Sequence, residues 1–338
     1  MHGLKDYRST GINKPRVSIG MPIYNAEKYI RESLEALLNQ TFSDFELIIS
    51  DNASTDATEA ICREYASKDS RIKYSRNETN LGGAKNFNRA FELSQGEYFK
   101  WAAHDDLCAP EFIERCVEVL DRNPSVVLCY PKAKEIDDQG TEIREYEAEL
   151  NIRSSKPHER LYKFLETNGL YHGTQTFGLM RASALKQTSL LGNYPHADRA
   201  LLAEVALRGE FCEVPEYLFF RRIHEGNSIH KGKDQKAKVT DEQLAAWFDP
   251  KNRGKLMLPK WRRYYEYFVA VNHAQLSWNE RINCYLQMLR RLFISPGFLV
   301  RVQGMIADLT KVTRLLPYLL LGRRQESTKV VETRKKAA

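Results

Sequence analysis

Short apolar runs rich in β-branched and aromatic residues alternate with helical patterns through the first 130 residues of the chain. We expect strands at 16–23, 45–50, 71–75, 98–102 and 126–130. We expect the intervening helices at 26–39, 57–66, 84–93 and 110–121. Continuous apolar strands that alternate with helices are typical of a parallel sheet covered on both faces. The pattern therefore predicts a doubly wound, mostly parallel α/β sheet flanked by helices.

Beyond residue 130 the order is less regular. We expect a turn at 137–140, a charged loop over 141–157, helices at 158–168 and 197–209, and strands at 174–181 and 217–223. From about 231 a charged stretch leads into helical patterns at 241–248, 259–273, 278–293 and 297–318. Ser277 and Glu280 have the spacing of a capping box for the third of these helices. We therefore predict an α/β domain over 15–230 and a helical, basic C-terminal extension over 231–338.

The net charge of +7 comes from the end of the chain. Residues 281–338 hold 12 Lys and Arg against 3 Asp and Glu, so the rest of the chain is slightly acidic. Such a basic tail suits an anionic membrane surface, nucleic acid or plain solvent. No run has the eighteen or so charge-poor apolar residues that a membrane-spanning helix needs.

The cysteines and the N-terminus bear on the compartment. Six cysteines are scattered without a C-x-x-C pair, which argues against a zinc site and favours a reducing compartment. The first fifteen residues contain no apolar core of signal-peptide length. We therefore expect a cytoplasmic protein.

Two acidic turns follow predicted strands. Asp51 comes directly after the strand at 45–50, and Asp105 and Asp106 follow the strand at 98–102. Ligands of open α/β sheets bind at the carboxyl ends of strands. Asp51 can accept a hydrogen bond from a base or a ribose hydroxyl, or can simply cap the next helix. The Asp105–Asp106 pair can hold a magnesium-bound phosphate, or can be a solvated turn.

Two later residues are further candidates. Asp198 begins the helix predicted at 197–209, where it can act as a general base or as an ordinary N-terminal helix acid. His196 is a rival base. His224 follows the last predicted strand and can bind a metal, bind phosphate or lie on the surface.

These residues occur together in a pattern that resembles family 2 glycosyltransferases of the GT-A fold. The resemblance covers roughly residues 15–230. It rests on segments in a fixed order: 17–25 (VSIGMPIYN), 40–46 (QTFSDFE), 51–56 (DNASTD), 80–82 (NLG), Asn88, 96–98 (GEY), 104–106 (HDD), 178–181 (GLMR), Asp198 and 222–224 (RIH). The first three segments are the most specific of these. The sequence departs from the family pattern at Ala103, where the first aspartate of the Asp-x-Asp motif falls, and at Phe87.

The resemblance implies an inverting, metal-dependent transfer of a sugar from a nucleotide diphosphate. It assigns Asp198 as the general base and Asp105, Asp106 and His224 to a Mg²⁺ or Mn²⁺ ion. It assigns Asp105 also to the nucleotide-sugar donor, expected to be a UDP-sugar, together with these residues: Pro22, Tyr24, Asn25, Asp51, Asn88 and His104.

The expected acceptor is a saccharide or a lipid-linked sugar, in cell-surface polysaccharide or glycolipid assembly. The apolar side of 297–318 suits contact of 297–324 with the inner face of the membrane, or packing on the catalytic domain. We expect no nucleic-acid partner. Without a Gln-x-x-Arg-Trp motif or a spanning helix, one sugar per encounter is the simpler expectation.

Three other functions are alternatives. A nucleotidyltransferase would share the sheet, but no Gly-rich loop follows the first strand. A dinucleotide-dependent oxidoreductase needs G-x-G-x-x-G there, which 20–24 (GMPIY) cannot supply. A non-catalytic module that binds nucleotide sugars is the alternative that the substitution at Ala103 encourages.

Overall fold

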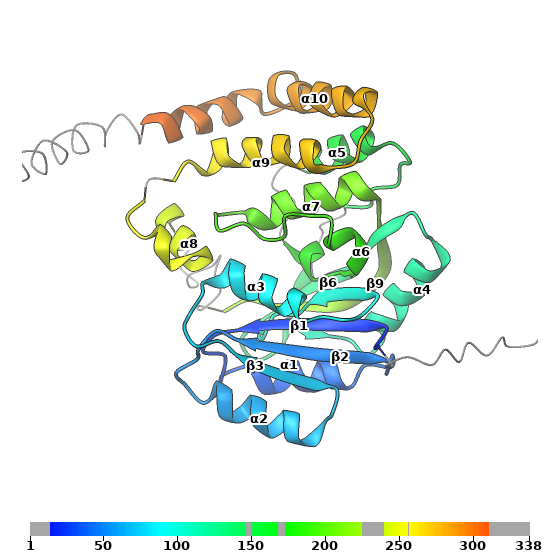
Figure 1. Cartoon of the computed structure of the whole chain (residues 1–338), viewed down its shortest axis with the longest axis vertical. Coiled ribbons are helices and arrows are strands. Elements are labelled where there is room, and N and C mark those ends of the chain that lie inside the picture. Colours follow the sequence, from blue (N-terminus) through cyan, green and yellow to red (C-terminus); the bar gives the residue numbers. More distant parts are fainter. Residues whose placement is uncertain (1–13, 147–149, 168–172, 225–239, 256, 311–338) are drawn as a thin grey trace, which may run out of the picture.

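The computed structural model describes residues 14–146, 150–167, 173–224, 240–255 and 257–310. Within these residues a nine-stranded sheet has the order β3-β2-β1-β4-β8-β6-β9-β5, and β7 pairs with β6 outside this path (Figure 1). The strands are β1 Val17–Ile23, β2 Phe45–Asp51, β3 Ile72–Arg76, β4 Tyr98–Trp101, β5 Leu107–Cys108, β6 Val126–Ile136, β7 Glu142–Tyr146, β8 Leu179–Arg181 and β9 Glu210–Arg222.

The first half of the sheet is parallel. β1 pairs in parallel with β2 and with β4, and β2 pairs in parallel with β3. β6 and β9 are also parallel to each other, whereas β8 is antiparallel to β4 and β6. All seven residues of β1 and of β2 are buried, as expected of strands that are covered on both faces. The predicted doubly wound sheet is confirmed, and its second half is mixed.

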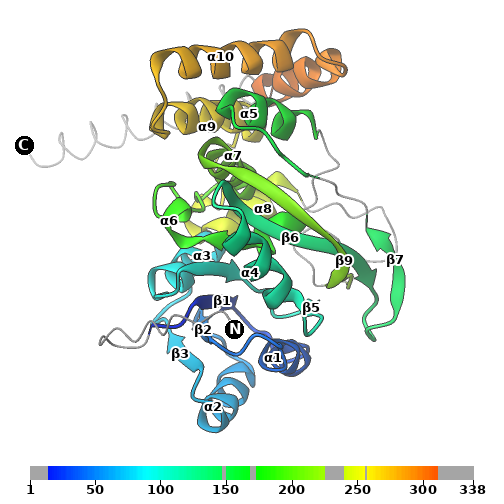
Figure 2. The ribbon, with the colours of Figure 1, turned by 90° about the vertical axis from the view of Figure 1, so that its right-hand side faces the viewer.

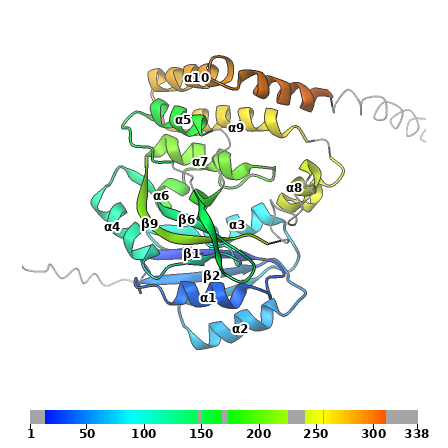
Figure 3. The same cartoon turned by 180° about the vertical axis from the view of Figure 1, so that it is seen from behind.

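Helices cover both faces of this sheet. The apolar side chains of α1 (Ile30–Leu38), α2 (Thr58–Lys68) and α4 (Phe112–Arg122) pack with Val17, Ile19 and Met21 of β1 in one cluster. α3 (Gly83–Glu92) and α7 (Ala197–Arg208) pack in a second cluster, which includes Phe99 and Trp101 of β4. Figures 1 and 3 show α1 and α2 on one side of the sheet and α3 and α7 on the other.

The C-terminal helices are stacked on the second face. α5 (Pro157–Glu166) and α9 (Pro259–His273) lie over α7, and α10 (Trp278–Phe293) forms the outermost layer with a helix at Phe298–Thr310 (Figure 2). α8 (Asp241–Phe248) lies beside α3. Phe248, Tyr267 and Cys284 belong to the same buried cluster as Leu201 of α7. The predicted helical extension therefore shares a core with the α/β part, and its expected boundary at 230 lies outside the described residues.

Most predicted elements are confirmed within a few residues, and 259–273 and 278–293 match α9 and α10 at both ends. The capping box is also confirmed: Ser277 Oγ accepts from Glu280 N, and the Glu280 carboxylate accepts from Ser277 N.

Two predictions need correction, and one strand was missed. The strand expected at 174–181 is a 3₁₀ turn, η1 (Thr174–Phe177), followed by the short β8, because Gly178 breaks the run. The loop expected at 141–157 contains β7, whose residues are mostly exposed and so show no apolar alternation. The two-residue strand β5 was not predicted, since it is too short for a periodic signal.

No single helix among the described residues is long and apolar enough to cross a membrane. By length and composition α10 and the helix at 298–310 pass that test only as a pair, and they are bent by 89° relative to each other.

Candidate active site

The carboxyl ends of the central parallel strands meet at one edge of the sheet. Ile23 at the end of β1 is in register with Asp51 at the end of β2. The backbone N–H of Ala102, just after β4, donates to the carbonyl of Gly20 in β1. The acidic turns at Asp51 and at 104–106 therefore lie along the same edge, where open α/β sheets bind their ligands.

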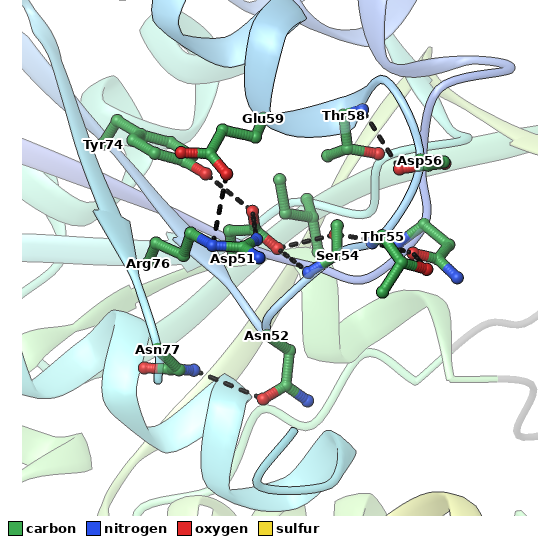
Figure 4. A network of polar contacts seen from close by, with 12 residues as sticks. Asp51, Asn52, Ser54, Thr55, Asp56, Thr58, Glu59, Tyr74, Arg76 and Asn77 are labelled. Atoms are coloured by element: carbon green, nitrogen blue, oxygen red, sulfur yellow. Dashed lines mark hydrogen bonds and ion pairs between the residues drawn. The ribbon is translucent and has the colours of Figure 1, made fainter. Parts of the chain in front are cut away.

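Asp51 is fully buried and is the centre of a polar network (Figure 4). Its Oδ1 accepts hydrogen bonds from Ser54 N at 2.9 Å and Ser54 Oγ at 2.6 Å. Its Oδ2 accepts from Tyr74 Oη at 2.6 Å and Arg76 at 3.0 Å. A carboxylate offers about four acceptor positions, so this network fills them. The network holds the turn after β2 and ties it to β3.

Asp105 and His224 lie together at the next strand ends. Asp105 Oδ2 is 2.9 Å from His224 Nε2, and both side chains are largely buried. Asp106 has a different role, because its Oδ1 accepts from the backbone N–H of Arg222 at 2.9 Å and so fixes the end of β9. The structure brings Asp105 and His224 together from positions 119 residues apart.

The two neighbouring carboxyl groups differ in acidity. Burial acts to raise the pKa of Asp105, but the hydrogen bond to His224 and the charges of His104 and His224 outweigh it, so the pKa is lowered. Burial, together with the charge of Asp105, raises the pKa of Asp106 to about 8. One charged and one neutral carboxyl group thus occupy this turn near neutral pH.

Arg222 is a site residue that the sequence did not single out. Its side chain is fully buried, and its Nε donates to the carbonyl of Asp105 at 2.9 Å. One terminal nitrogen donates to the carbonyl of Asp138 at 3.0 Å and the other to Glu32 at 2.6 Å. The guanidinium therefore clamps the acidic turn between α1 and the turn after β6. The adjacent basic pair, Arg221 and Arg222, was a signal, but nothing in it indicates which residue points inward.

The residues after β1 lie at the same edge, between the ends of β2 and β4. Tyr24 is 45% exposed, and Asn25 has a φ of 49°. Asn25 Oδ1 accepts from Thr55 N at 2.8 Å, and Asn25 N donates to Ser54 Oγ. Pro22 is buried in β1 opposite Ser50. This geometry ties the ends of β1 and β2 together and leaves the ring of Tyr24 open to solvent.

Asn88 points elsewhere. Its side-chain amide donates to the carbonyl of Leu191 and its Oδ1 accepts from Leu191 N, at 2.9 and 3.0 Å. Asn86, two residues earlier, instead lies at the strand ends, where its amide donates to the carbonyls of Ile23 and Ser50. The predicted set did not include Asn86, although it lies on the same helix, because only the orientation of α3 separates the two asparagines.

Asp198 lies close to Gly173, the residue just before η1. β8 runs antiparallel to β4, with Tyr98 opposite Arg181, so η1 lies beyond the carboxyl end of β4. Asp198 Oδ2 is 3.8 Å from the position that a β-carbon would take on Gly173, directly before η1. His196 caps α7 with a φ of 65°, and burial followed by the charges of Arg263 and Arg199 lowers its pKa to about 4. His196 is therefore neutral near pH 7.

The described residues contain no group of three or more His, Cys, Asp or Glu side chains that could hold a metal ion by themselves. The Asp105–His224 pair supplies one carboxylate oxygen and one imidazole nitrogen. Mg²⁺ is usually held by one or two carboxylates, with substrate phosphates and water as the other ligands. The donor set therefore fits a metal that arrives with a diphosphate.

Residues 18–189 match the model of the family described as glycosyl transferase family 2. The chain is 35% identical over 140 residues to an uncharacterised glycosyltransferase of Methanocaldococcus jannaschii, covering 41% of this chain and 48% of that protein. It is 29% identical over 248 residues to one of Haemophilus influenzae, covering 70% and 76%. The chain thus spans about half the length of the first relative.

The fold is similar to that of residues 1–349 of S. aureus TarS, solved in complex with UDP-GlcNAc, with a TM-score of 0.60 and 21% identity. The similarity covers 87% of this chain and 79% of the TarS chain. The family model matches half of the sequence, and the fold agrees with that of TarS. The chain belongs to glycosyl transferase family 2.

Proposed function

We propose that this protein transfers one sugar from a nucleotide-diphosphate sugar to an acceptor hydroxyl, with inversion and with a divalent metal. The observation that carries the proposal is the Asp105–His224 pair, which lies on the sheet edge that Asp198 also approaches. The similar fold of TarS, which was solved with UDP-GlcNAc, supports a UDP-sugar as the first donor to test.

The donor's base and ribose would lie against the turns after β1 and β2, near Tyr24, Asn25 and His104. Asp51 is our candidate to read the base, but its oxygens already accept four hydrogen bonds. A base N–H would therefore have to displace Arg76 or Tyr74 from this carboxylate. Asn88 bonds to Leu191, so a contact with the donor would need it to leave that backbone.

Asp105 and His224 would hold Mg²⁺ or Mn²⁺, and Asp106 would fix the turn through the backbone of Arg222. When bound, the ion would stabilise negative charge on the departing diphosphate. The charged form of Asp105 is the form that binds a cation. The lowered pKa of Asp105 supports this role, because it keeps the carboxylate ionised at neutral pH.

Asp198 would accept the proton of the acceptor hydroxyl as its oxygen attacks the anomeric carbon. The new glycosidic bond forms on the face opposite the diphosphate, whose bond to the sugar breaks as the electron pair leaves with it. This single displacement inverts the anomeric centre. A positioned general base contributes roughly 10²–10⁴-fold to such rates.

Replacement of Asp198 by Asn tests this role. We expect Asp198→Asn to lower the transfer rate by about 10²–10⁴-fold while the Kd of the donor with Mn²⁺ stays unchanged. The measurement is single-turnover transfer alongside calorimetric donor binding. Transfer at the wild-type rate by a variant that binds donor normally would assign the base to another residue. A wild-type protein that binds donor yet never turns it over would favour a non-catalytic module.

We also propose that the protein docks on the inner face of the membrane, where lipid-linked acceptors of polysaccharide or glycolipid assembly would meet it. The outer face of α10 carries exposed apolar side chains at helical spacing: Trp278, Ile282, Leu286, Leu289 and Phe293. In the helix at 298–310, Met305 and Asp308 are buried, and Trp261 and Lys260 of α9 donate hydrogen bonds to them. Its Leu299, Ile306 and Leu309 remain exposed.

This helix thus supports both expectations for 297–318. One side packs on α9, and the other side exposes apolar residues that could contact a membrane. Amphipathic surfaces of this kind bind anionic leaflets when basic residues flank them. The basic residues of 311–338, including part of the expected contact region 297–324, lie outside the described residues.

A further inference from the structure

A cavity of about 50 Å³ lies between four helices on the Asp198 side of the molecule. Its polar lining consists of Arg199 of α7, Arg263, Tyr264 and Tyr267 of α9, Arg291 of α10 and Thr167 after α5. Figures 1 and 2 show these helices stacked over the second face of the sheet. A single water needs roughly 10–15 Å³, so this arginine cavity holds several water-sized groups, about the space of one phosphate.

The charge in the arginine cavity is one-sided. Three guanidinium groups line it, and none of its described lining residues is acidic. Arginine stays protonated in proteins, so three positive charges meet here. Burial lowers the pKa of both Arg263 and Arg291, which is the sign of cations that have lost water without full compensation.

Two of these side chains are differently engaged. Arg291 is held in place, because its Nε donates to the carbonyl of Leu165 at 2.7 Å and a terminal nitrogen to that of Pro296 at 3.3 Å. The Nε of Arg263 is buried and has no hydrogen-bond partner among the described residues. A buried hydrogen-bond donor without an acceptor lowers the stability of the fold unless a bound group accepts from it. A multiply charged oxyanion would accept from the Nε of Arg263 and add negative charge beside the guanidinium groups.

The arginine cavity lies beside the proposed base. Arg199 directly follows Asp198, and the charge of Asp198 also acts on Arg263. The charge of Arg263 lowers the pKa of the buried His196 imidazole, and the charge of Asp198 raises it. An anion bound here is thus a neighbour of the residue that would receive the acceptor's proton. The Asp105–His224 pair that would face the donor diphosphate belongs to different elements, the ends of β4 and β9.

We propose that the arginine cavity binds a phosphate group of the acceptor and so directs the acceptor hydroxyl toward Asp198. The proposal rests on the glycosyl transfer proposed above and adds the class of acceptor, a phosphorylated one. Guanidinium groups bind phosphate through paired, charge-assisted hydrogen bonds, and three of them match the oxygens of a phosphate better than a singly charged carboxylate.

The test compares Arg263→Gln with Arg253→Gln, a matched loss of one positive charge from an exposed arginine outside the cavity. Inorganic phosphate is titrated into the full chain by calorimetry. We expect Arg263→Gln to weaken phosphate binding about tenfold or more, because a charge-assisted hydrogen bond is lost. Arg253→Gln should bind like the wild type. Equal phosphate affinity in Arg263→Gln and wild type would overturn the proposal, and so would equal losses in both variants.

Folding is controlled in two ways. Arg263→Gln removes a cation whose pKa is lowered by burial and whose Nε has no hydrogen-bond partner among the described residues, so its thermal unfolding midpoint without phosphate should be no lower than that of the wild type. Arg263→Lys keeps the charge and loses the planar fork, so it should lose part of the phosphate affinity and retain the rest. If both Arg263 variants bound phosphate with the wild-type affinity, the phosphate site would be ruled out, even if one variant were less stable than the wild type.

Two further probes identify the carrier of the phosphate. Glycerol 3-phosphate represents a soluble acceptor, and vesicles of phosphatidylcholine with phosphatidic acid represent a lipid one. If Arg263→Gln loses binding of only one of these two probes, that probe identifies the carrier of the phosphate. If the variant binds both probes like the wild type, the proposal is contradicted. Donor binding with Mn²⁺ should stay unchanged in Arg263→Gln. If the wild-type protein binds the donor but never transfers its sugar while Arg263→Gln still loses phosphate affinity, the proposed function fails and the phosphate site stands.

Discussion

At the scale of single residues, the ionised side chains of the sheet edge are held by partners from distant elements. Asp51 of β2 meets Tyr74 and Arg76 of β3, and Asp105 meets His224. Each carboxylate is therefore positioned before any ligand arrives. Such preorganisation lets a site bind charge without first rearranging.

Replacement of Asp51 by Asn should destabilise the fold. The fully buried carboxylate would lose its charge, and Arg76 and Tyr74 would lose an acceptor of full strength. We expect the free energy of unfolding to fall by roughly 2–4 kcal/mol, less than for a fully buried ion pair because Arg76 is partly exposed. Urea unfolding measures this, with the exposed Asp44→Asn as control. A loss below that of the control would show that the network contributes little to stability.

His196 should make stability depend on pH. Its pKa is about 4 in the folded protein and about 6.5 when unfolded, so between these values the unfolded chain binds the extra proton. The contribution is fully present above pH 6.5 and is lost as the pH falls from 6.5 to 4, by about 3 kcal/mol. His196→Asn, which tolerates the positive φ, should remove this loss. Equal slopes of unfolding free energy against pH in both proteins would contradict the assignment.

At the scale of secondary-structure elements, α10 is packed on one side and leaves its other side uncovered. Its inner side is anchored by Arg291, whose guanidinium donates to the carbonyl of Leu165 in α5. Its outer face exposes five large apolar side chains by 51–75%. An amphipathic helix normally turns its apolar stripe inward, so an outward stripe suits a further apolar surface.

Two charges on this stripe should release the protein from vesicles. Leu286→Glu combined with Leu289→Glu places carboxylates where the side chains would enter the leaflet. We expect binding to phosphatidylcholine–phosphatidylglycerol vesicles to fall at least about tenfold, since each buried leucine contributes roughly 1.5–3 kcal/mol. Flotation measures this, with Ile143→Glu on β7 as control. Flotation of the double variant equal to that of the control would dismiss the membrane contact.

At the scale of the whole molecule, the bound donor should stabilise the protein by mass action. A ligand at about 100 times its Kd adds roughly 2.7 kcal/mol to the free energy of unfolding. We expect UDP-sugar with Mn²⁺ to raise the unfolding midpoint, and Asp105→Asn to abolish the part of the rise that requires metal. Differential scanning calorimetry with and without EDTA separates the two parts. A rise of the same size in EDTA would argue against a metal-dependent donor site.

The sequence predicted the sheet because buried parallel strands and their helices leave strong, regular apolar patterns. It could not predict β5 or β7, since two residues and an exposed hairpin strand carry no such pattern. The pairing of Asp105 with His224 followed only from a family resemblance. The clamp by Arg222 and the arginine cavity did not follow at all, because neighbouring arginines look alike in a sequence until packing turns one of them inward.

The buried guanidinium of Arg222 joins α1, the acidic turn and the hairpin turn at 137–140 into one rigid block. A change in that hairpin would thus be transmitted to the proposed metal ligands without touching a substrate.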